Sequence, residues 1–132
     1  MNRVNGNINN KKDRTLFQLA IGAQKGQISF SNLDNLDGNS YKIESSQIQG
    51  ETILVDIDSI DSLIEESGLE NPTVWKIDLE GAELDLLKGA KRFLTKTKPK
   101  IYLSTHNCHV KGVEDQCANF LTQIGYTYSK VE

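Results

Sequence analysis

The segment at residues 74–83, VWKIDLEGAE, constrains the fold of this chain most, because a strand-like alternation changes there into a glycine and a helical pattern. Side chains of a strand point alternately to opposite faces, so three apolar residues share one face and three charged residues share the other. The apolar row is Trp75, Ile77 and Leu79, and the charged row is Lys76, Asp78 and Glu80. Gly81 then allows a sharp turn. The segment predicts a strand that ends in ionisable groups beside a helix.

The rest of the chain alternates between strand-like and helix-like patterns. Strands are expected at 15–21, 27–31, 51–57, 100–104 and 126–131, besides the one that begins at 73, and helices at 58–68, from Glu80 to Pro99 and at 113–125. The order strand, helix, strand, helix, strand from residue 73 onward predicts an α/β sheet with crossover helices. The two glycines within 22–26 predict a hairpin over 15–31, and residues 32–50 are expected to form a long loop.

Helix boundaries are marked by capping residues. Asp58 or Ser59 is expected to cap the start of the helix at 58–68, and Gly68 to end it. Gly125 is expected to cap the end of the helix at 113–125. The helix after Glu80 has acidic residues in its first turn, as the helix dipole favours. These acidic residues are Glu83 and Asp85.

Composition and charge exclude several classes of protein. The 132 residues are 37% hydrophobic and 25% charged, which is typical of one soluble domain with a core. Neither a membrane span nor a signal peptide is visible, so we expect a cytoplasmic protein with no membrane partner. Residues 34–85 hold fourteen acidic and two basic side chains. This acidic block would repel a phosphate backbone, so nucleic acid is not expected as a partner.

The cysteines and histidines near residue 108 do not match a usual zinc pattern. They are His106, Cys108, His109 and Cys117. Cys117 falls on the apolar face of its predicted helix, which indicates a core thiol, and both cysteines are expected to be reduced. We therefore expect no metal site among them.

The charged row at the end of the strand allows two interpretations. Ligands of open α/β sheets bind beyond the carboxyl ends of the strands, where Asp78 and Glu80 would lie. Alternatively, Lys76 is buried and satisfied by these carboxylates, in an internal ion pair beside a helix N-terminus. The residues alone leave both interpretations open.

The run from Val74 to Leu94, VWKIDLEGAELDLLKGAKRFL, resembles the most recognisable block of the FkbM family of S-adenosylmethionine-dependent methyltransferases. Upstream, LFQLAIGAQKGQISF and VDIDSIDSLI are similar to further segments of that family, as is PKIYLSTHN downstream. The resemblance covers nearly the whole chain, residues 1–132, as a single partial domain. It implies a Rossmann-like class I methyltransferase fold and O-methylation of a small-molecule or sugar hydroxyl.

Site roles follow from the resemblance. The end of the strand at Ala20, Ile21 and Gly22 would lie near the adenine of S-adenosylmethionine. Asp78 would lie at the cofactor as well, and with Glu80 it would face the methyl group and the acceptor, as an electrostatic stabiliser or an acceptor ligand. His106 is the candidate general base, since its ordinary pKa near 6.5 suits proton removal at neutral pH. The alternative is that His106 is a loop histidine without a role.

Two departures from the family pattern affect these expectations. Ser104 replaces the family's glutamate, and no two glycines of the chain are separated by a single residue, as a glycine-rich cofactor loop would require. The chain is therefore expected to lack the N-terminal glycine-rich strand, loop and helix, to bind S-adenosylmethionine weakly or not at all, and to be inactive by itself. An open sheet edge along 15–21 or 73–78 would favour self-association. Alternatives are a non-catalytic remnant or interaction module, and an incomplete or split gene.

Overall fold

The computed structural model describes residues 3–4, 15–31, 52–108 and 110–131, and these form seven strands and four helices. The strands are β1 (Arg3–Val4), β2 (Leu16–Phe17), β3 (Ala20–Ile21), β4 (Gly26–Ser31), β5 (Thr52–Asp58), β6 (Val74–Ile77) and β7 (Lys100–Leu103). The helices are α1 (Ile60–Ser67), α2 (Glu83–Gly89), α3 (Lys91–Thr97) and α4 (Val113–Gln123). This mixture confirms the predicted α/β class. The loop predicted at 32–50 lies outside the described residues.

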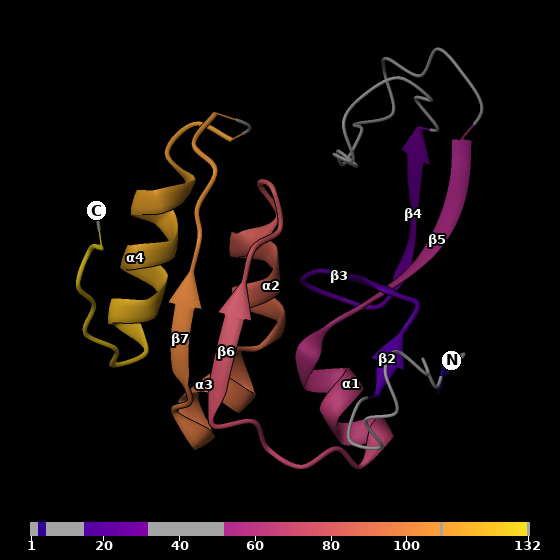
Figure 1. Cartoon of the computed structure of the whole chain (residues 1–132), viewed down its shortest axis with the longest axis horizontal. Helices are drawn as coiled ribbons and strands as arrows, with labels where there is room; N and C mark the ends of the chain where they lie inside the picture. The colour runs from indigo at the N-terminus through magenta and orange to yellow at the C-terminus, as the bar shows by residue number, and fades with distance from the viewer. Residues whose placement is uncertain (1–2, 5–14, 32–51, 109, 132) are drawn as a thin grey trace, which may run out of the picture.

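Strands β6 and β7 form a parallel pair joined by the crossover through α2 and α3, as the sequence predicts. Both strands point the same way in Figure 1, so their carboxyl ends and the loops that follow lie at one edge. The Ser104 N–H donates to the Ile77 carbonyl over 2.9 Å and extends the pairing by one residue. The crossover therefore brings the segment after β6 beside the segment after β7.

The predicted hairpin over 15–31 is wrong, because β5 lies between the two strands that would have formed it. The order in this sheet is β3-β5-β4, with β3 parallel and β4 antiparallel to β5. The Gly22 N–H donates to the Asp58 carbonyl over 3.0 Å, which continues the parallel pairing beyond Ile21. The turn after Gly22 thus carries the chain across β5 instead of back along β3.

The single strand predicted at 15–21 is divided in two. Its first part, β2, pairs antiparallel with β1, whereas its second part, β3, pairs with β5. The two parts serve different sheets, so the backbone between them at 18–19 is not a strand. The described strands form three small sheets, and the Rossmann-like arrangement of one whole sheet stays a prediction.

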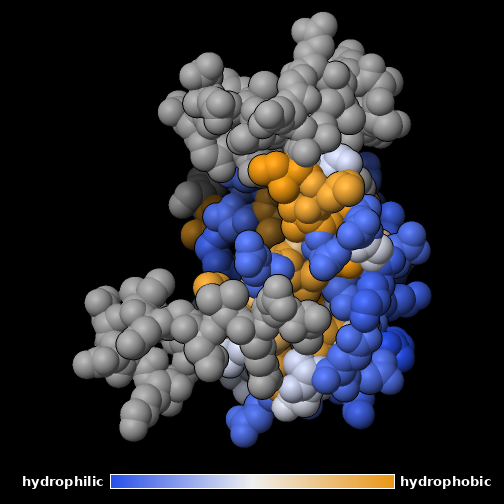
Figure 2. Space-filling view, turned by 90° about the vertical axis from the view of Figure 1, so that its right-hand side faces the viewer, coloured by the Kyte–Doolittle hydropathy of each residue, from blue (hydrophilic) through white to orange (hydrophobic). Residues whose placement is uncertain are grey.

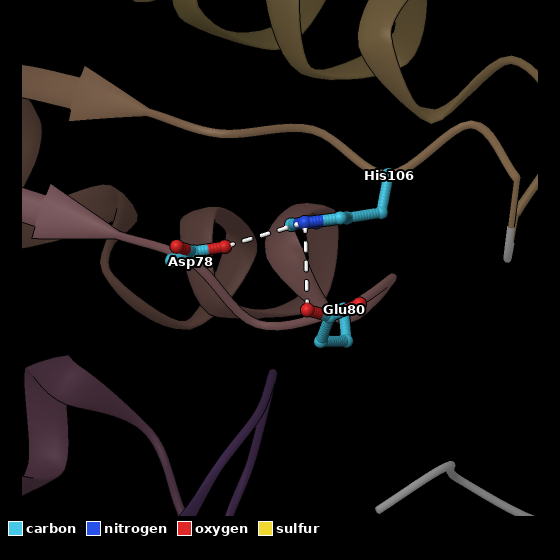
Figure 3. A group of neighbouring side chains, drawn as sticks. All are labelled: Asp78, Glu80 and His106. Carbon is cyan, nitrogen blue, oxygen red and sulfur yellow. Dashed lines mark ion pairs between the residues drawn. The ribbon is translucent and has the colours of Figure 1, made fainter. Parts of the chain in front are cut away.

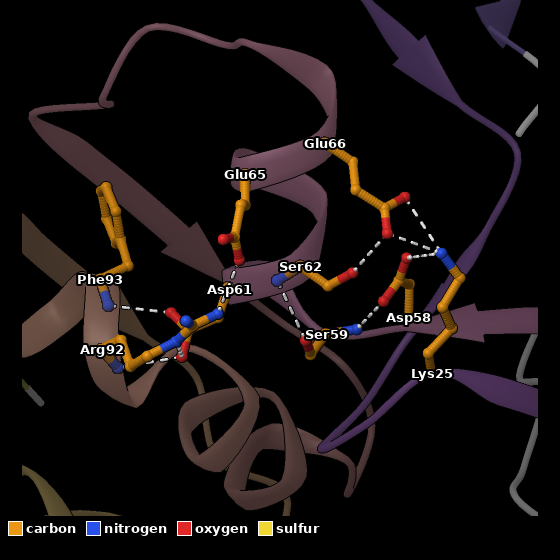
Figure 4. A network of polar contacts seen from close by, with 9 residues as sticks. All are labelled: Lys25, Asp58, Ser59, Asp61, Ser62, Glu65, Glu66, Arg92 and Phe93. Carbon is orange, nitrogen blue, oxygen red and sulfur yellow. Dashed lines mark hydrogen bonds and ion pairs between the residues drawn. The ribbon is translucent and has the colours of Figure 1, made fainter.

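The start of α1 is capped as the sequence predicts. The Ser59 hydroxyl accepts from the Ser62 N–H over 3.2 Å, so Ser59 is the N-cap, and the buried Asp58 carboxylate accepts from the Ser59 N–H over 2.7 Å. Gly68 ends the helix in the left-handed conformation. Figure 4 shows Lys25 facing Asp58 and Glu66 beside this cap.

The helix predicted between Glu80 and Pro99 is broken at Ala90 into α2 and α3. The Asp61 carboxylate of α1 accepts from the backbone N–H groups of Arg92 and Phe93 over 3.0 and 2.8 Å (Figure 4). It thereby caps α3 from another helix. At the same place, a side chain on Gly89 would begin 2.2 Å from the Gly22 carbonyl oxygen. The cap from Asp61 and the close approach of Gly89 to Gly22 explain the break between the helices. The helical spacing of apolar residues in the sequence does not reveal it.

The core lies between the β6–β7 pair and helices α2, α3 and α4 (Figure 1). Its buried members are Ile77, Leu86, Leu87, Ala90, Phe93, Leu94, Val113, Cys117 and Leu121. The Trp75 ring stacks on Phe93 with ring centres 5.1 Å apart, so the apolar row of β6 faces the helices as predicted. The charged row consequently faces away from this core.

The strand predicted at 126–131 is wrong, since none of these residues is in a strand. Gly125 has a positive φ, and the Tyr126 N–H donates to the Leu121 carbonyl over 3.0 Å. Together with the bond from the Gly125 N–H to the Thr122 carbonyl, this is a Schellman motif. The Tyr126 hydroxyl also donates to the Leu94 carbonyl. Tyr126 thus packs on the helices, although alternation alone favours a strand.

The side of the molecule that carries β4 and β5 is turned toward the viewer in Figure 2, where hydrophobic side chains gather between hydrophilic ones. Ile53 and Leu54 of β5 are 51% and 66% exposed.

The helices of the described residues are all too short or too polar to cross a membrane.

Candidate active site

The candidate site lies where the chain leaves the parallel strands β6 and β7. Asp78 directly follows β6, and His106 lies in the loop after β7 (Figure 3). Glu80 and Gly81 turn the chain toward α2 with φ angles of 53° and 108°. Glu80 has a Cβ and adopts the left-handed backbone conformation, so its backbone is strained. The turn directs its side chain back toward His106 (Figure 3).

His106 is the centre of the site. Its Nδ1 lies 2.8 Å from Glu83 Oε1. Its Nε2 lies 3.4 Å from Asp78 Oδ1 and 3.6 Å from Glu80 Oε1 (Figure 3). The structure thus brings together all three side chains that the sequence singled out at this edge, Asp78, Glu80 and His106.

Glu83 is the functional candidate that sequence reasoning missed. Its side chain is fully buried, and its Oε1 also accepts from the Gly81 N–H over 3.1 Å. Its other oxygen, Oε2, is buried without a hydrogen bond among the described residues. The sequence explained Glu83 by the helix dipole alone, and its match to the family block was the signal of a further role. A buried carboxylate that holds a histidine nitrogen fixes the orientation of that ring.

The charges around His106 change its protonation. Its pKa is raised above the ordinary value, chiefly by the hydrogen bond with Glu83, against partial desolvation and with help from the charges of Glu80, Glu83 and Asp78. Burial raises the pKa of Glu83, but the hydrogen bonds from His106 and Gly81 outweigh it, so this pKa is lowered overall. The pair therefore favours imidazolium and carboxylate together at mildly acidic pH.

Lys76 and Asp78 form an ion pair at the surface. The Lys76 Nζ donates to Asp78 Oδ2 over 2.8 Å and to the Ser104 hydroxyl over 3.3 Å. The hydrogen bond from Lys76 to Asp78 is the main reason why the pKa of Asp78 is lowered. The side chain of Lys76 is 61% exposed, so the interpretation as a buried internal ion pair is wrong. Exposed ion pairs contribute little to stability, and the row of charges needs another explanation.

Ala20, Ile21 and Gly22, the residues expected near the adenine, lie at the end of β3. The first two are half-buried, and Gly22 is buried. A side chain at Gly22 would begin 2.5 Å from Ile57 Cδ1, so the Ile57 side chain would have to move to accommodate it. These residues belong to a different sheet from Asp78, and their role in cofactor binding stays a prediction.

The cysteines occupy two different environments. Cys117 is buried in α4 within the core, and burial followed by the charge of Glu83 raises its pKa to about 11, so it stays a thiol. Cys108 is exposed, and His109 lies outside the described residues. The prediction of a core thiol at Cys117 is confirmed.

A hollow of about 290 Å³ lies between α1 and α3, and none of the site residues lines it. Three of its charged lining residues form ion pairs: Arg92 contacts Glu65 over 3.0 Å and Asp61 over 3.5 Å. The hollow is therefore separate from the cluster around His106.

An acidic, histidine-centred edge beyond two parallel strands defines a site of the kind that α/β enzymes use. The family model of the methyltransferase FkbM domain matches residues 3–128. The chain belongs to the FkbM methyltransferase family, and this membership suggests methyltransferase activity. No match was found among curated proteins or among solved structures.

Proposed function

We propose that this protein transfers a methyl group from S-adenosylmethionine to a hydroxyl group of a small molecule or saccharide. One observation carries the proposal: His106 is held at Nδ1 by the buried Glu83, and its Nε2 faces Asp78 and Glu80 at the carboxyl ends of β6 and β7. This combination of a base, a residue that orients it and an acidic edge suits the removal of a proton from an acceptor.

His106 is the proposed general base. In its neutral form, the Nδ1–H donates to Glu83 and the Nε2 lone pair is directed toward Asp78 and Glu80. An acceptor hydroxyl bound at this edge would lose its proton to Nε2 as its oxygen becomes nucleophilic. The carboxylate of Glu83 would stabilise the imidazolium that results, as the orienting acid of a catalytic triad does.

Asp78 and Glu80 are the proposed ligands of the acceptor. Their side chains are 48% and 36% exposed, so a solute can reach them. Ionised carboxylates accept hydrogen bonds only, and adjacent hydroxyl groups of a saccharide can donate to both. This chemistry favours an acceptor with several hydroxyl groups.

S-adenosylmethionine, when bound, supplies a methyl group on a positively charged sulfur. The carboxylates of Asp78 and Glu80 suit a cationic group, and the half-buried Ala20 and Ile21 suit an apolar ring. Gly22 fits less directly, because its N–H is already bonded to the Asp58 carbonyl. We therefore propose Ala20, Ile21 and Asp78 as cofactor contacts, with Gly22 as a support for β3.

The test measures transfer of radiolabelled methyl groups to a panel of sugars and small alcohols, at high cofactor concentration because binding is expected to be weak. Because the 132-residue chain is expected to be inactive by itself, the rates are measured on a version that also carries the glycine-rich strand, loop and helix of the family. This version is expected to label at least one acceptor, and His106→Gln and Glu83→Gln to lower its rate by about 10²-fold or more. Glu70→Gln removes an exposed carboxylate elsewhere and serves as the matched control. Folding of each variant is checked by circular dichroism.

Failure of the proposal has a clear signature. If the version with the glycine-rich segment labels no acceptor and calorimetry detects no cofactor binding to it, the protein is a non-catalytic module that retains the fold. Equal rates in the wild type and in both site variants would show that transfer takes place at another site.

A further inference from the structure

Three atoms that can each share a lone pair converge in front of β6 and β7. They are Asp78 Oδ1, Glu80 Oε1 and His106 Nε2, and the ligand atoms of these residues lie within 4.8 Å of one another. Figure 3 shows the imidazole directed between the two carboxylates. Two carboxylates and one imidazole form a ligand set typical of divalent transition metals.

The hydrogen bond to Glu83 determines which nitrogen of His106 is available. With the Nδ1–H donating to Glu83 Oε1 over 2.8 Å, the neutral ring presents a lone pair at Nε2. Histidines that bind metals commonly donate their other N–H to a carboxylate in this way, which fixes the tautomer and makes the ligand more basic. The Glu83 side chain is fully buried, so the group that holds Nδ1 is shielded from solvent.

The distances from His106 Nε2 to the two carboxylate oxygens fit a single small ion. Two ligands at about 2.1 Å from a tetrahedral centre lie about 3.4 Å apart. Nε2 lies 3.4 Å from Asp78 Oδ1 and 3.6 Å from Glu80 Oε1. Both distances leave room for an ion between the ring nitrogen and the carboxylate oxygens.

The surrounding charges also favour a cation. Three carboxylates, those of Asp78, Glu80 and Glu83, surround one imidazole, and Lys76 neutralises part of this charge through Asp78 Oδ2. On the side of α4, the thiol of Cys117 stays protonated and adds no charge. A divalent ion at Oδ1 would not displace Lys76, which contacts the other oxygen of Asp78.

We propose that Asp78, Glu80 and His106 bind one divalent transition-metal ion of the zinc type, with the Glu83 carboxylate holding Nδ1 of His106. Three protein ligands leave a fourth position open, as in catalytic zinc sites. This set is distinct from the cysteines and histidines near residue 108, of which it includes only His106. The role of the site in the reaction rests on the proposed methyl transfer, and with the metal bound the ion takes the place of His106 as the group that activates the acceptor.

A metal in this position changes the chemistry of the proposed reaction. An acceptor hydroxyl in the fourth position would be polarised, and its pKa would fall as the pKa of metal-bound water does. His106 would then be a ligand and not the base, because its Nε2 lone pair is used on the metal. The proton of the hydroxyl would pass to solvent at the exposed edge formed by Asp78 and Glu80.

The test is direct binding of Co²⁺ to the purified chain, followed by the visible absorption that distinguishes tetrahedral from octahedral cobalt, with Zn²⁺ calorimetry beside it. We expect one ion per chain with a tetrahedral spectrum. His106→Gln and Asp78→Asn should each weaken binding at least tenfold, and Glu83→Gln about tenfold. Asp78 is half-exposed, so its variant keeps the test valid if a change at His106 disturbs folding.

Two controls keep the assignment specific. Cys108→Ser removes an exposed thiol close to His106 in the sequence, and Glu70→Gln removes an exposed carboxylate elsewhere. Both should bind Co²⁺ as the wild type does. Absence of binding, or binding that His106→Gln and Asp78→Asn both retain, would overturn the site, as would loss of binding in Cys108→Ser. Methyl transfer by protein that holds no metal would overturn the inferred role of the metal but would keep the proposed methyltransferase function. Metal binding without methyl transfer would keep the metal site but would overturn the proposed function.

Discussion

His106 Nδ1 lies 2.8 Å from Oε1 of Glu83, a carboxylate with no exposed surface. The contact joins the loop after β7 to the first turn of α2, 23 residues earlier in the chain. It fixes the orientation of the His106 ring, whereas a loop histidine without such a contact could rotate.

Asp78→Asn should lower methyl transfer strongly, by about 10²-fold, and leave the melting temperature nearly unchanged. The reason is that Asp78 faces His106, whereas its ion pair with Lys76 is at the surface. Thermal unfolding measured beside the transfer rate checks both parts. A large loss of stability with a proportionate loss of rate would instead support a structural role for this pair.

His106→Gln should reduce transfer most near neutral pH and less at high pH. In the wild type the base is available only above the pKa of His106, which is raised, so the rate should increase as pH passes upward through that value. At higher pH, hydroxide can accept the proton of the acceptor in place of the histidine, and the difference between the two proteins should become smaller. Rates of both from pH 6 to 10 provide the check; a constant ratio between them would remove His106 as the base.

Glu83→Gln should change how stability depends on pH. The pKa of Glu83 is lowered, so its contribution is present above the ordinary glutamate value and lost in acid. The pKa of His106 is raised, so its contribution is present below its ordinary value and lost as pH rises through the folded value. The pair thus stabilises most between about pH 4.5 and 6.5. Urea unfolding should show a loss of about 1.5–3 kcal/mol in this window and less outside it. An equal loss at every pH would mean that Glu83 acts by packing alone.

S-adenosylmethionine should bind the 132-residue chain weakly. No two glycines of the sequence are separated by one residue, and the Gly22 N–H is already bonded within the protein. Close backbone approach to a cofactor of this kind normally uses a glycine-rich turn. Titration calorimetry checks this, and a dissociation constant in the micromolar range would show that the cofactor site lies elsewhere.

The chain should self-associate along β6, whose outer edge has no strand partner among the described residues. Val74 on this strand is 55% exposed, and unpaired apolar edges favour pairing with another chain. Val74→Lys should therefore reduce association, as measured by analytical ultracentrifugation over a range of concentrations. Equal association of the variant and the wild type would exclude this edge.

Local signals in the sequence predicted local structure. Ser59, Gly68 and Gly125 cap helices where the sequence placed them, because each acts on backbone groups a few residues away. The parallel pair β6–β7 also follows from the pattern, since a helix between two strands requires a crossover. The candidate edge with Asp78, Glu80 and His106 followed from the position of strand ends and from the family block.

Contacts between distant residues could not be predicted in this way. The cap that Asp61 provides to α3 acts across 31 and 32 residues, and the partner of Glu83 is 23 residues away. The insertion of β5 between β3 and β4 depends on which edges are free to pair, and alternation does not contain that information. Tyr126 likewise has a strand-like pattern but packs on the helices through its hydroxyl.

Asp78, Glu80, Glu83 and His106 all come from one continuous strand–helix–strand unit, which begins with β6 and ends in the loop after β7. Contacts of short sequence separation form faster than distant ones, because less chain entropy is lost when they close. The cluster is therefore expected to assemble at the same stage of folding as the β6–β7 pair. The pairing of β3, β4 and β5, which depends on residues on both sides of 32–51, is expected to come later.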